Sequence, residues 1–441
     1  MNVVGIIAEY NPFHLGHLYQ ILTLRKNSDT DYIIVVMSGN FVQRGEPALM
    51  DKYTRAQMAL LQGADLVLEL PALYATASAE LFALGGVKLL NSTGVATRLC
   101  FGAETNTLAP LKKVADILST ETEKYTCFFH SYLKQGLSFP AARAKALQDV
   151  IVLENAKILE NAKAFEYAKA LQGILASPNN ILAVEYLKSI RSTNSALTPY
   201  LIQRKGSGYH DASFDSPYTS ATAIRKKLFV QSDDSFRHPK AIPPNDSFHH
   251  LKNALPDPSF QILQDYARQS AFLSENDFSL PLHCKLLASG QNDLLCYADS
   301  GVSLSNRIAK RKYDFLNWKQ FCGLLKTKEI TYTRISRLLT HILLDVKTAD
   351  YATAASTEYL PYLRVLGFKK GAEPLLSAIK KAAIAPLVTS VCDASRFLPA
   401  YGMELLSKDL YAADLYQSVL TNKTGSIYKN EYQRKMMVCD A

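Results

Sequence analysis

Short apolar runs alternate with helical patterns along the first half of the chain, and this alternation limits the fold more than any other feature. Runs typical of buried strands cover residues 3–10, 31–38, 65–70, 96–104 and 199–205, with helical periodicity between them. Strands that alternate with helices favour a parallel sheet, because each helix returns the chain to the same edge. We therefore predict a doubly wound α/β fold with a parallel sheet, whose ligands bind at the carboxyl ends of the strands.

The pattern changes after Leu228. Residues 231–250 are polar and contain three prolines, which is typical of a linker or a loop-rich boundary. Beyond them the periodicity is mostly helical. The sequence thus predicts two parts, an α/β domain over residues 1–228 and a mostly helical, basic region over residues 229–441.

Positive charge is concentrated in one segment of the chain. The 441 residues carry a formal net charge of +9, and residues 301–350 hold ten Lys or Arg against four Asp or Glu. Such an excess is typical of proteins that bind a polyanion, such as a nucleic acid. The alternative is a solvated helix face, which most charge clusters are.

The seven cysteines are scattered singly, without a CxxC pair. This pattern excludes zinc-ribbon spacing and indicates reduced thiols of a cytosolic protein. The N-terminus lacks the basic and small-residue features of a signal peptide, and no apolar run reaches the ~20 residues of a membrane helix. We expect a soluble, cytoplasmic protein that binds no membrane.

The segment "EYNPFHLGHLYQ" stands where the first predicted strand gives way to a helix. His14 and His17 are three residues apart, which places both on one face of the first helical turn. Backbone N–H groups and the helix dipole favour an anion there. Gly16 lets a ligand approach the backbone, and Asn11-Pro12 fixes the entry turn. These features predict a phosphate site with two imidazole donors.

Two other interpretations of this histidine pair stay open. A metal pair would need a distant third ligand, such as His210 or Asp211. The histidines could also be ordinary residues at the start of a helix. The order of strand, turn, His-x-Gly-His and helix favours the phosphate site.

A second segment, "SPYTSATAIRKKL", places Ser220, Thr222 and Arg225 at the start of a basic helix. Hydroxyls and a guanidinium at a helix N-terminus suit a triphosphate, although a plain N-capped helix has the same composition. Paired with His-x-Gly-His, the segment resembles the second motif of the HIGH-type nucleotidylyltransferase superfamily.

Further segments resemble the bacterial tRNA(Met) cytidine acetate ligases, namely "GIIAEYNPFHLGHLYQI", "VVMSGNFVQRGEPALMDKYTRAQMALLQGADLVLELP", "FGAE", "SPNNILAVEYLKSI" and "RKGSGYHD". The resemblance implies an enzyme that activates acetate with ATP to acetyl-adenylate. It implies acetyl transfer to the exocyclic amine of the wobble cytidine of elongator tRNA(Met), giving N4-acetylcytidine. A small-molecule nucleotidylyltransferase and a non-catalytic RNA-binding protein with a relic nucleotide fold remain alternatives.

By resemblance, three residues are catalytic and stabilise charge at the α-phosphate: His14, His17 and Arg225. The resemblance assigns ATP binding to Ile7, Ala8, Glu9, Tyr10, Asn11, Pro12, Phe13, His14, Leu15, Gly16, His17, Leu18, Tyr19, Gln20, Gly102, Asn179, Arg204, Ser220 and Thr222. Mg would accompany ATP as a counter-ion, without a dedicated metal site in the protein.

The remaining predicted sites concern the other two substrates. The loop over residues 38–47 is a candidate for acetate or the incoming cytosine, with Asn40 and Arg44 as its polar groups. With tRNA as the implied partner, and no DNA, the candidates for phosphate contacts are Lys310, Arg311, Lys312, Arg334 and Arg337. The aromatic side chains near them either stack on bases or pack in the core: Phe315, Trp318 and Tyr332.

Overall fold

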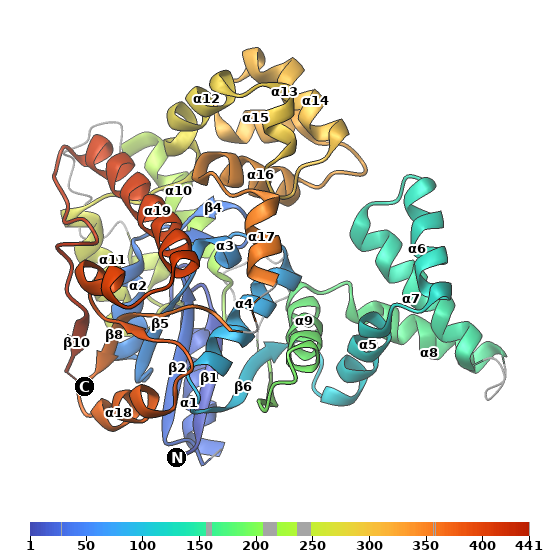
Figure 1. Cartoon of the computed structure of the whole chain (residues 1–441), viewed down its shortest axis with the longest axis horizontal. Coiled ribbons are helices and arrows are strands. Elements are labelled where there is room, and N and C mark those ends of the chain that lie inside the picture. Colours follow the sequence, from blue (N-terminus) through green and yellow to red (C-terminus); the bar gives the residue numbers. More distant parts are fainter. Residues whose placement is uncertain are drawn as a thin grey trace.

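A single large sheet forms the centre of the computed structural model, which describes residues 1–27, 29–155, 161–205, 218–235, 248–355, 357 and 359–440. The strand order is β10-β8-β5-β2-β1-β6-β7 (Figure 1). Five parallel strands follow the predicted runs: β1 (Val3–Ala8), β2 (Tyr32–Ser38), β5 (Leu66–Leu70), β6 (Ala96–Ala103) and β7 (Thr198–Gln203). The predicted doubly wound, mostly parallel sheet is confirmed.

Alternate residues of each strand enter different cores on the two faces of the sheet. Val4 and Ile6 pack with α1 (Leu15–Asn27) and α2 (Lys52–Leu61), whereas Val3 and Ile7 pack on the opposite side. That side is covered by α4 (Ala79–Ser92) and α9 (Pro178–Ser192). Strands covered on both faces must be apolar throughout, which explains the continuous runs in the sequence.

The direction of the strand order changes beside β1. From β1 the chain proceeds outward to β2 and β5, and then returns to β6 and β7 on the other side of β1. A crevice opens at the carboxyl ends of the strands where two such halves separate. The first motif follows β1 directly, so the topology places it at this crevice.

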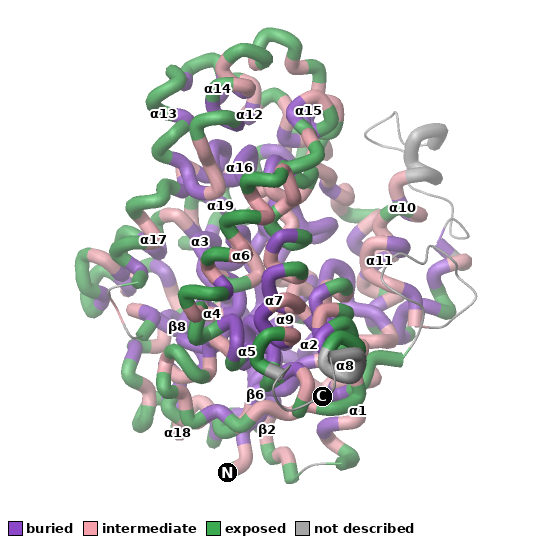
Figure 2. Tube along the Cα trace, turned by 90° about the vertical axis from the view of Figure 1, so that its right-hand side faces the viewer, coloured by how far each residue is buried: buried purple, intermediate pink, exposed green. Residues whose placement is uncertain are grey.

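Four helices form an arm beyond α9, away from the sheet (Figure 1). They are α5 (Leu108–Thr120), α6 (Glu123–Lys134), α7 (Phe139–Asn155) and α8 (Asn161–Ile174). The helical character predicted for this stretch is confirmed. In Figure 2 buried residues gather around the sheet and its neighbouring helices.

The region after Leu228 is mostly helical, as predicted. α10 (Ala221–Ser235) runs across Leu228. The helices that follow it are α11 (Asp257–Gln269), α12 (Ser279–Ala288), α13 (Gln291–Leu295), α14 (Val302–Arg311), α15 (Trp318–Leu325), α16 (Tyr332–Leu344), α17 (Thr348–Ala355), α18 (Glu373–Ala382) and α19 (Ala400–Thr424).

This region also completes the sheet, which the sequence analysis did not predict. β8 (Leu363–Lys369) pairs antiparallel with β5, and β10 (Met437–Cys439) and β9 (Leu387–Val388) pair with β8. The division at residue 228 therefore stays a prediction, and the sheet takes strands from both sides of it. β8 is seven residues long, and the mostly helical pattern of the region had not indicated it.

Buried charges join the two halves beside β8. Lys52 Nζ lies 2.8 Å from Glu69 Oε1 and 3.0 Å from Glu431 Oε2, and Arg364 Nη2 lies 3.1 Å from the same Glu431 oxygen. All four side chains are buried. Removal of one member of a buried ion pair typically costs about 3–5 kcal/mol, because its partner is left uncompensated.

The described residues include no helix that is long and apolar enough to cross a membrane. The seven cysteines are free thiols. The stretch predicted as a loop after β2 contains a small hairpin, β3 (Phe41–Val42) with β4 (Glu46–Pro47).

Candidate active site

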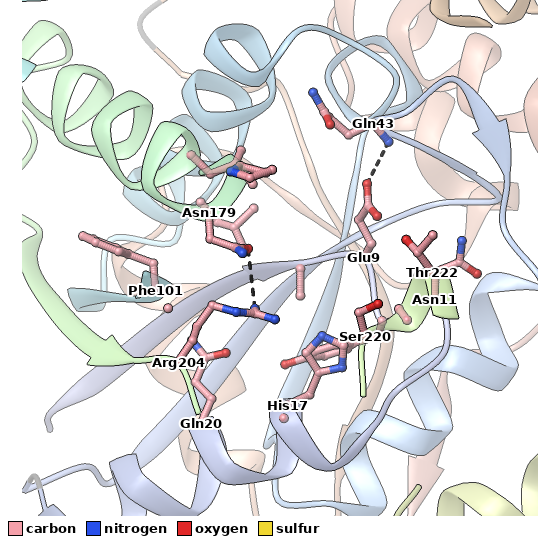
Figure 3. A pocket seen from close by; sticks show the side chains of 18 of the residues that line it. Glu9, Asn11, His17, Gln20, Gln43, Phe101, Asn179, Arg204, Ser220 and Thr222 are labelled. Carbon is pink, nitrogen blue, oxygen red and sulfur yellow. Dashed lines mark hydrogen bonds between the residues drawn. The ribbon is translucent and has the colours of Figure 1, made fainter. Parts of the chain in front are cut away.

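A cavity of about 720 Å³ opens at the carboxyl ends of β1, β6 and β7 (Figure 3). Its size is typical of a site for a small molecule or cofactor. The predicted residues that line it are Ile7, Ala8, Glu9, Tyr10, Asn11, His14, Gly16, His17, Tyr19, Gln20, Arg44, Gly102, Asn179, Arg204, Ser220, Thr222 and Arg225. Pro12, Phe13, Leu15, Leu18 and Asn40 are not part of this lining.

Of the helices that begin at this cavity, three carry predicted site residues. α1 contributes Gly16 and His17, α9 contributes Asn179, and α10 contributes Ser220 and Thr222. The positive ends of three helix dipoles favour a ligand with several negative charges. The two sequence motifs, far apart along the chain, therefore face one site.

The two histidines hold each other in a reciprocal cap. α1 begins at Leu15, so His14 lies one residue before the helix rather than within its first turn as predicted. His14 Nδ1 accepts a hydrogen bond from the Gly16 N–H (3.0 Å), and His17 Nδ1 accepts one from the His14 N–H (3.2 Å). This arrangement is the pattern of a capping box, with imidazoles in place of the usual side chains.

The cap decides which imidazole nitrogen carries the proton. Because each Nδ1 accepts from a backbone N–H, each neutral ring carries its proton on Nε2 and is a donor there. Burial, and then the charge of Arg204, lowers the pKa of His14 to about 3. Burial, His14 and Arg204 hold the pKa of His17 well below its usual value. The free protein thus presents two neutral donors.

The backbone of this first turn is already occupied. The Leu15 N–H donates to the Ala254 carbonyl, and the Gly16 and His17 N–H groups donate to His14. The prediction that unpaired backbone N–H groups of α1 bind the anion therefore needs correction, because the cap and residue 254 satisfy them. The imidazole Nε2–H groups are the donors left for a ligand.

Gly16 is required by the ring of His14. A Cβ at this position would lie 2.9 Å from His14 Cε1 and 3.1 Å from Nδ1. The sequence analysis explained this glycine by the approach of a ligand. The structure shows in addition that its missing side chain makes room for the stacked rings, whose centroids lie 3.7 Å apart.

Arg225 connects three parts of the site. Its Nη1 donates to the Asn11 carbonyl (2.8 Å), and its Nη2 forms an ion pair with Glu46 on β4. The guanidinium also lines the cavity. Glu46 was not predicted, and its pairing means that an anion entering the site meets an arginine already held in place.

The opposite end of the cavity is organised by Glu104, which the sequence analysis missed. Its carboxylate accepts hydrogen bonds from Asn179 Nδ2 (2.6 Å) and the Asn180 N–H (3.0 Å). Asn179 Oδ1 in turn accepts from Arg204 Nη1 (3.5 Å), and Figure 3 shows this contact. A glycine at 102 fits this end, since a Cβ there would lie 3.2 Å from Arg204 Cγ.

The two polar groups predicted for the hairpin loop have different positions. Arg44 lines the cavity, together with Gln43, which was not predicted. Asn40 is buried, and its Oδ1 accepts a hydrogen bond from the Lys52 N–H (2.8 Å). Fully buried Arg55 fixes the loop, because it donates to the backbone carbonyls of Ser38, Gly39, Met50 and Glu9.

The C-terminal region forms part of the cavity wall. Thr331 and Thr333, at the N-terminus of α16, line the cavity. α16 packs closely on the hairpin, and Ser336 Oγ donates to the Gly45 carbonyl (2.6 Å). No sequence signal had connected α16 with the nucleotide motifs, because the contact depends on tertiary packing.

The basic residues predicted to contact tRNA differ in their surroundings. Lys310 and Arg311 are exposed, and Arg311 forms an exposed ion pair with Asp314. Lys312 Nζ donates to carbonyls at the end of α12: Leu286, Leu287 and Ser289. Arg337 makes a two-point ion pair with Asp299 (2.8 and 3.1 Å), and Arg334 Nε donates to the Asp299 carbonyl.

Trp318 belongs to the core rather than to a base-stacking surface. Its side chain is fully buried, and its Nε1 donates to Ser336 Oγ (3.2 Å). Phe315 is half-buried and stacks on His283, whereas Tyr332 is partly exposed. Of these three aromatic side chains, that of Tyr332 is therefore the one exposed to solvent.

Within the described part of the chain, no three or more His, Cys, Asp or Glu side chains are grouped so that they could hold a metal ion. His210 and Asp211, the distant ligands of the metal interpretation, lie outside the described residues.

Comparison with known proteins decides the family. A family model described as HIGH Nucleotidyl Transferase matches residues 1–431. The tRNA(Met) cytidine acetate ligase of Thermoanaerobacter sp. (strain X514) is 37% identical over 427 residues, 97% of each chain. The chain belongs to this HIGH-type ligase family. The tRNA(Met) cytidine acetate ligase of Alkaliphilus metalliredigens (strain QYMF) is 36% identical over 431 residues, 97% of this chain and 96% of the relative.

Solved structures of the ligase family have the same fold. The crystal structure of Thermotoga maritima TmcAL (apo, form I) superposes with a TM-score of 0.88 at 30% identity, over 100% of both chains. The same protein bound with alpha-thio ATP (form II) gives a TM-score of 0.86 at 29% identity, again over 100% of both chains. The resemblance stated from the sequence is confirmed.

Proposed function

We propose that the chain uses this cavity to activate acetate with ATP and then to acetylate the wobble cytidine of elongator tRNA(Met). One observation supports this most: two neutral imidazole donors, Arg225 and three helix N-termini converge on one cavity, in a chain that is related over its whole length to tRNA(Met) cytidine acetate ligases. With tRNA as substrate, we place the enzyme in the cytoplasm.

In the first step an acetate oxygen attacks the α-phosphorus of ATP. The new O–P bond forms as the bond to the bridging oxygen breaks, and pyrophosphate leaves with the electron pair. Acetate is ionised at neutral pH, so the step needs charge stabilisation rather than a strong base. His14 and His17 donate from Nε2 to the phosphate oxygens, and Arg225 offsets their charge. Mg would accompany ATP as its counter-ion.

In the second step the acetyl group passes to the exocyclic amine of cytidine, and AMP leaves. The nucleotide lies towards Gly102, Asn179 and Arg204, while tRNA approaches from the side of the hairpin and α16. Lys310 and Arg311, which are exposed, contact tRNA phosphates. Lys312 and Arg337 are held by contacts within the protein, which indicates that these two side chains stabilise the fold rather than contact tRNA.

The test is to incubate the protein with ATP, labelled acetate and tRNA, and to digest the tRNA to nucleosides. We expect labelled N4-acetylcytidine that depends on ATP, and none from tRNA(Met) whose wobble cytidine is replaced by uridine. Acetate-dependent pyrophosphate exchange without any labelled nucleoside would leave a nucleotidylyltransferase with another acceptor, and would refute the proposal.

A further inference from the structure

The cavity that we propose for anionic substrates also contains a carboxylate, that of Glu9. Glu9 follows β1, lines the cavity, and accepts a hydrogen bond at Oε1 from the Gln43 N–H (2.9 Å). Figure 3 shows the two side by side, away from Asn179 and Arg204. A carboxylate can accept about four hydrogen bonds, so the Gln43 bond leaves capacity for a ligand.

Arg55 holds the backbone of Glu9 in place. The buried Arg55 donates to the Glu9 carbonyl (2.6 Å) and to the carbonyls of Ser38 and Met50, which hold the hairpin beside it. A group held in this way keeps its orientation when a substrate enters. Gln43 then orients the carboxylate itself.

The surroundings of Glu9 select the kind of ligand it can face. Burial raises the pKa of this carboxyl above its usual value, while the Gln43 N–H, Arg44 and Arg225 lower it and Glu46 raises it. Acetate and the phosphates of ATP are anions, and a carboxylate repels them. Glu9 therefore needs a neutral hydrogen-bond donor. In the proposed reaction the amine of the incoming cytosine is such a donor, and a contact with it would give Glu9 a role other than the ATP binding that the resemblance implied.

Aromatic side chains line the same cavity as Glu9. Tyr186 is nearly fully buried and lines the same cavity, as does Phe82 of α4. Burial raises the pKa of the Tyr186 phenol, and the charge of Glu9 raises it further. An unpaired anticodon base can be turned into such a pocket at low cost. Carboxylates are the usual acceptors for the cytosine amine.

We propose that Glu9 binds the exocyclic amine of the wobble cytidine and takes its proton during acetyl transfer. The inference rests on the proposed function. The amine nitrogen forms a bond to the acetyl carbon, the bond from that carbon to the AMP oxygen breaks, and AMP leaves with the electron pair. One N4 proton passes to the Glu9 carboxylate, which later releases it to water. A uridine at this position offers no N4 donor and is rejected.

The test replaces Glu9 by glutamine, which keeps the acceptor for the Gln43 N–H but removes the base. Two half-reactions are measured: acetate-dependent ATP–pyrophosphate exchange, and single-turnover transfer from enzyme-bound acetyl-adenylate to tRNA(Met). We expect Glu9→Gln to slow transfer by ~10²–10⁴-fold, the usual contribution of a general base, and to slow exchange far less. The transfer rate of the wild type should fall as the pH drops through the pKa of Glu9, and this dependence should disappear in the variant.

Glu275→Gln is the matched control. Glu275 lies outside the cavity lining, and the charges of Glu46 and Arg225 act on it as they do on Glu9. It should keep the wild-type ratio of the two half-reactions. An equal loss of exchange and transfer in Glu9→Gln would assign Glu9 to the nucleotide, and undiminished transfer would exclude it as the base. Failure of the wild type to form acetylcytidine would instead refute the proposed function.

Discussion

Gly16→Ala tests whether the histidine cap is the catalytic device. The added Cβ would lie 2.9 Å from Cε1 and 3.1 Å from Nδ1 of His14, both closer than ordinary carbon contacts. The imidazole must therefore turn away, which breaks its hydrogen bond from the residue 16 N–H. Its Nε2–H then loses the orientation in which the proposed mechanism uses it.

The expected effect follows from the loss of one aligned donor. Removing one preorganised donor to a developing negative charge lowers the rate by ~10²–10³-fold, about 2.7–4 kcal/mol. The fold should survive, because alanine is favoured over glycine in a helix by about 0.5–1 kcal/mol, which offsets part of the steric cost. We thus expect a folded protein with a severe loss of acetate-dependent pyrophosphate exchange.

The control is Gly323→Ala in α15, where an added Cβ meets nothing within 4 Å. This variant should gain up to about 1 kcal/mol in the free energy of unfolding and keep its exchange rate. Thermal unfolding and exchange are measured on both variants. Exchange within a few-fold of the wild type in Gly16→Ala would refute the role of the cap.

Three further predictions concern the histidines and the basic surface. His14→Ala and His17→Ala should each lower exchange by ~10²–10³-fold, and near-normal exchange in either would exclude that histidine from catalysis. Burial lowers the pKa of His14 to about 3. Below pH ~6.5 this imidazole is therefore protonated in the unfolded chain but stays neutral in the folded protein. Well below pH ~6.5 and above about pH 3, the free energy of unfolding should therefore fall by about 1.4 kcal/mol per pH unit from this group, and urea titrations of His14→Gln should lack this contribution. Replacing Lys310 and Arg311 by glutamate should weaken tRNA acetylation and its salt dependence while exchange stays constant; parallel loss of both would place these residues in the fold or the active site.

The chain by itself determined the parallel core of the sheet and the location of the nucleotide motifs. Continuous apolar runs are required of strands that are covered on both faces, so β1, β2, β5, β6 and β7 were visible in the sequence. The His-x-Gly-His spacing marked the start of α1, because a cap and the first helical turn are local structures. Ser220 and Arg225 were recognised in the same way.

Only the tertiary structure decided which side chains line the site together and which charged side chains have partners within the protein. The partners of Glu9, Arg225 and Lys312 come from segments distant in sequence, and no local period encodes such pairs. β8, from the C-terminal region, pairs with β5 and so satisfies the backbone N–H and C=O groups that β5 would otherwise expose at the edge of the sheet. This pairing depends on the assembled sheet, so the sequence of β8 alone does not indicate it. α16 reaches the cavity for the same physical reason: packing against the hairpin, rather than any local signal, places Thr331 there.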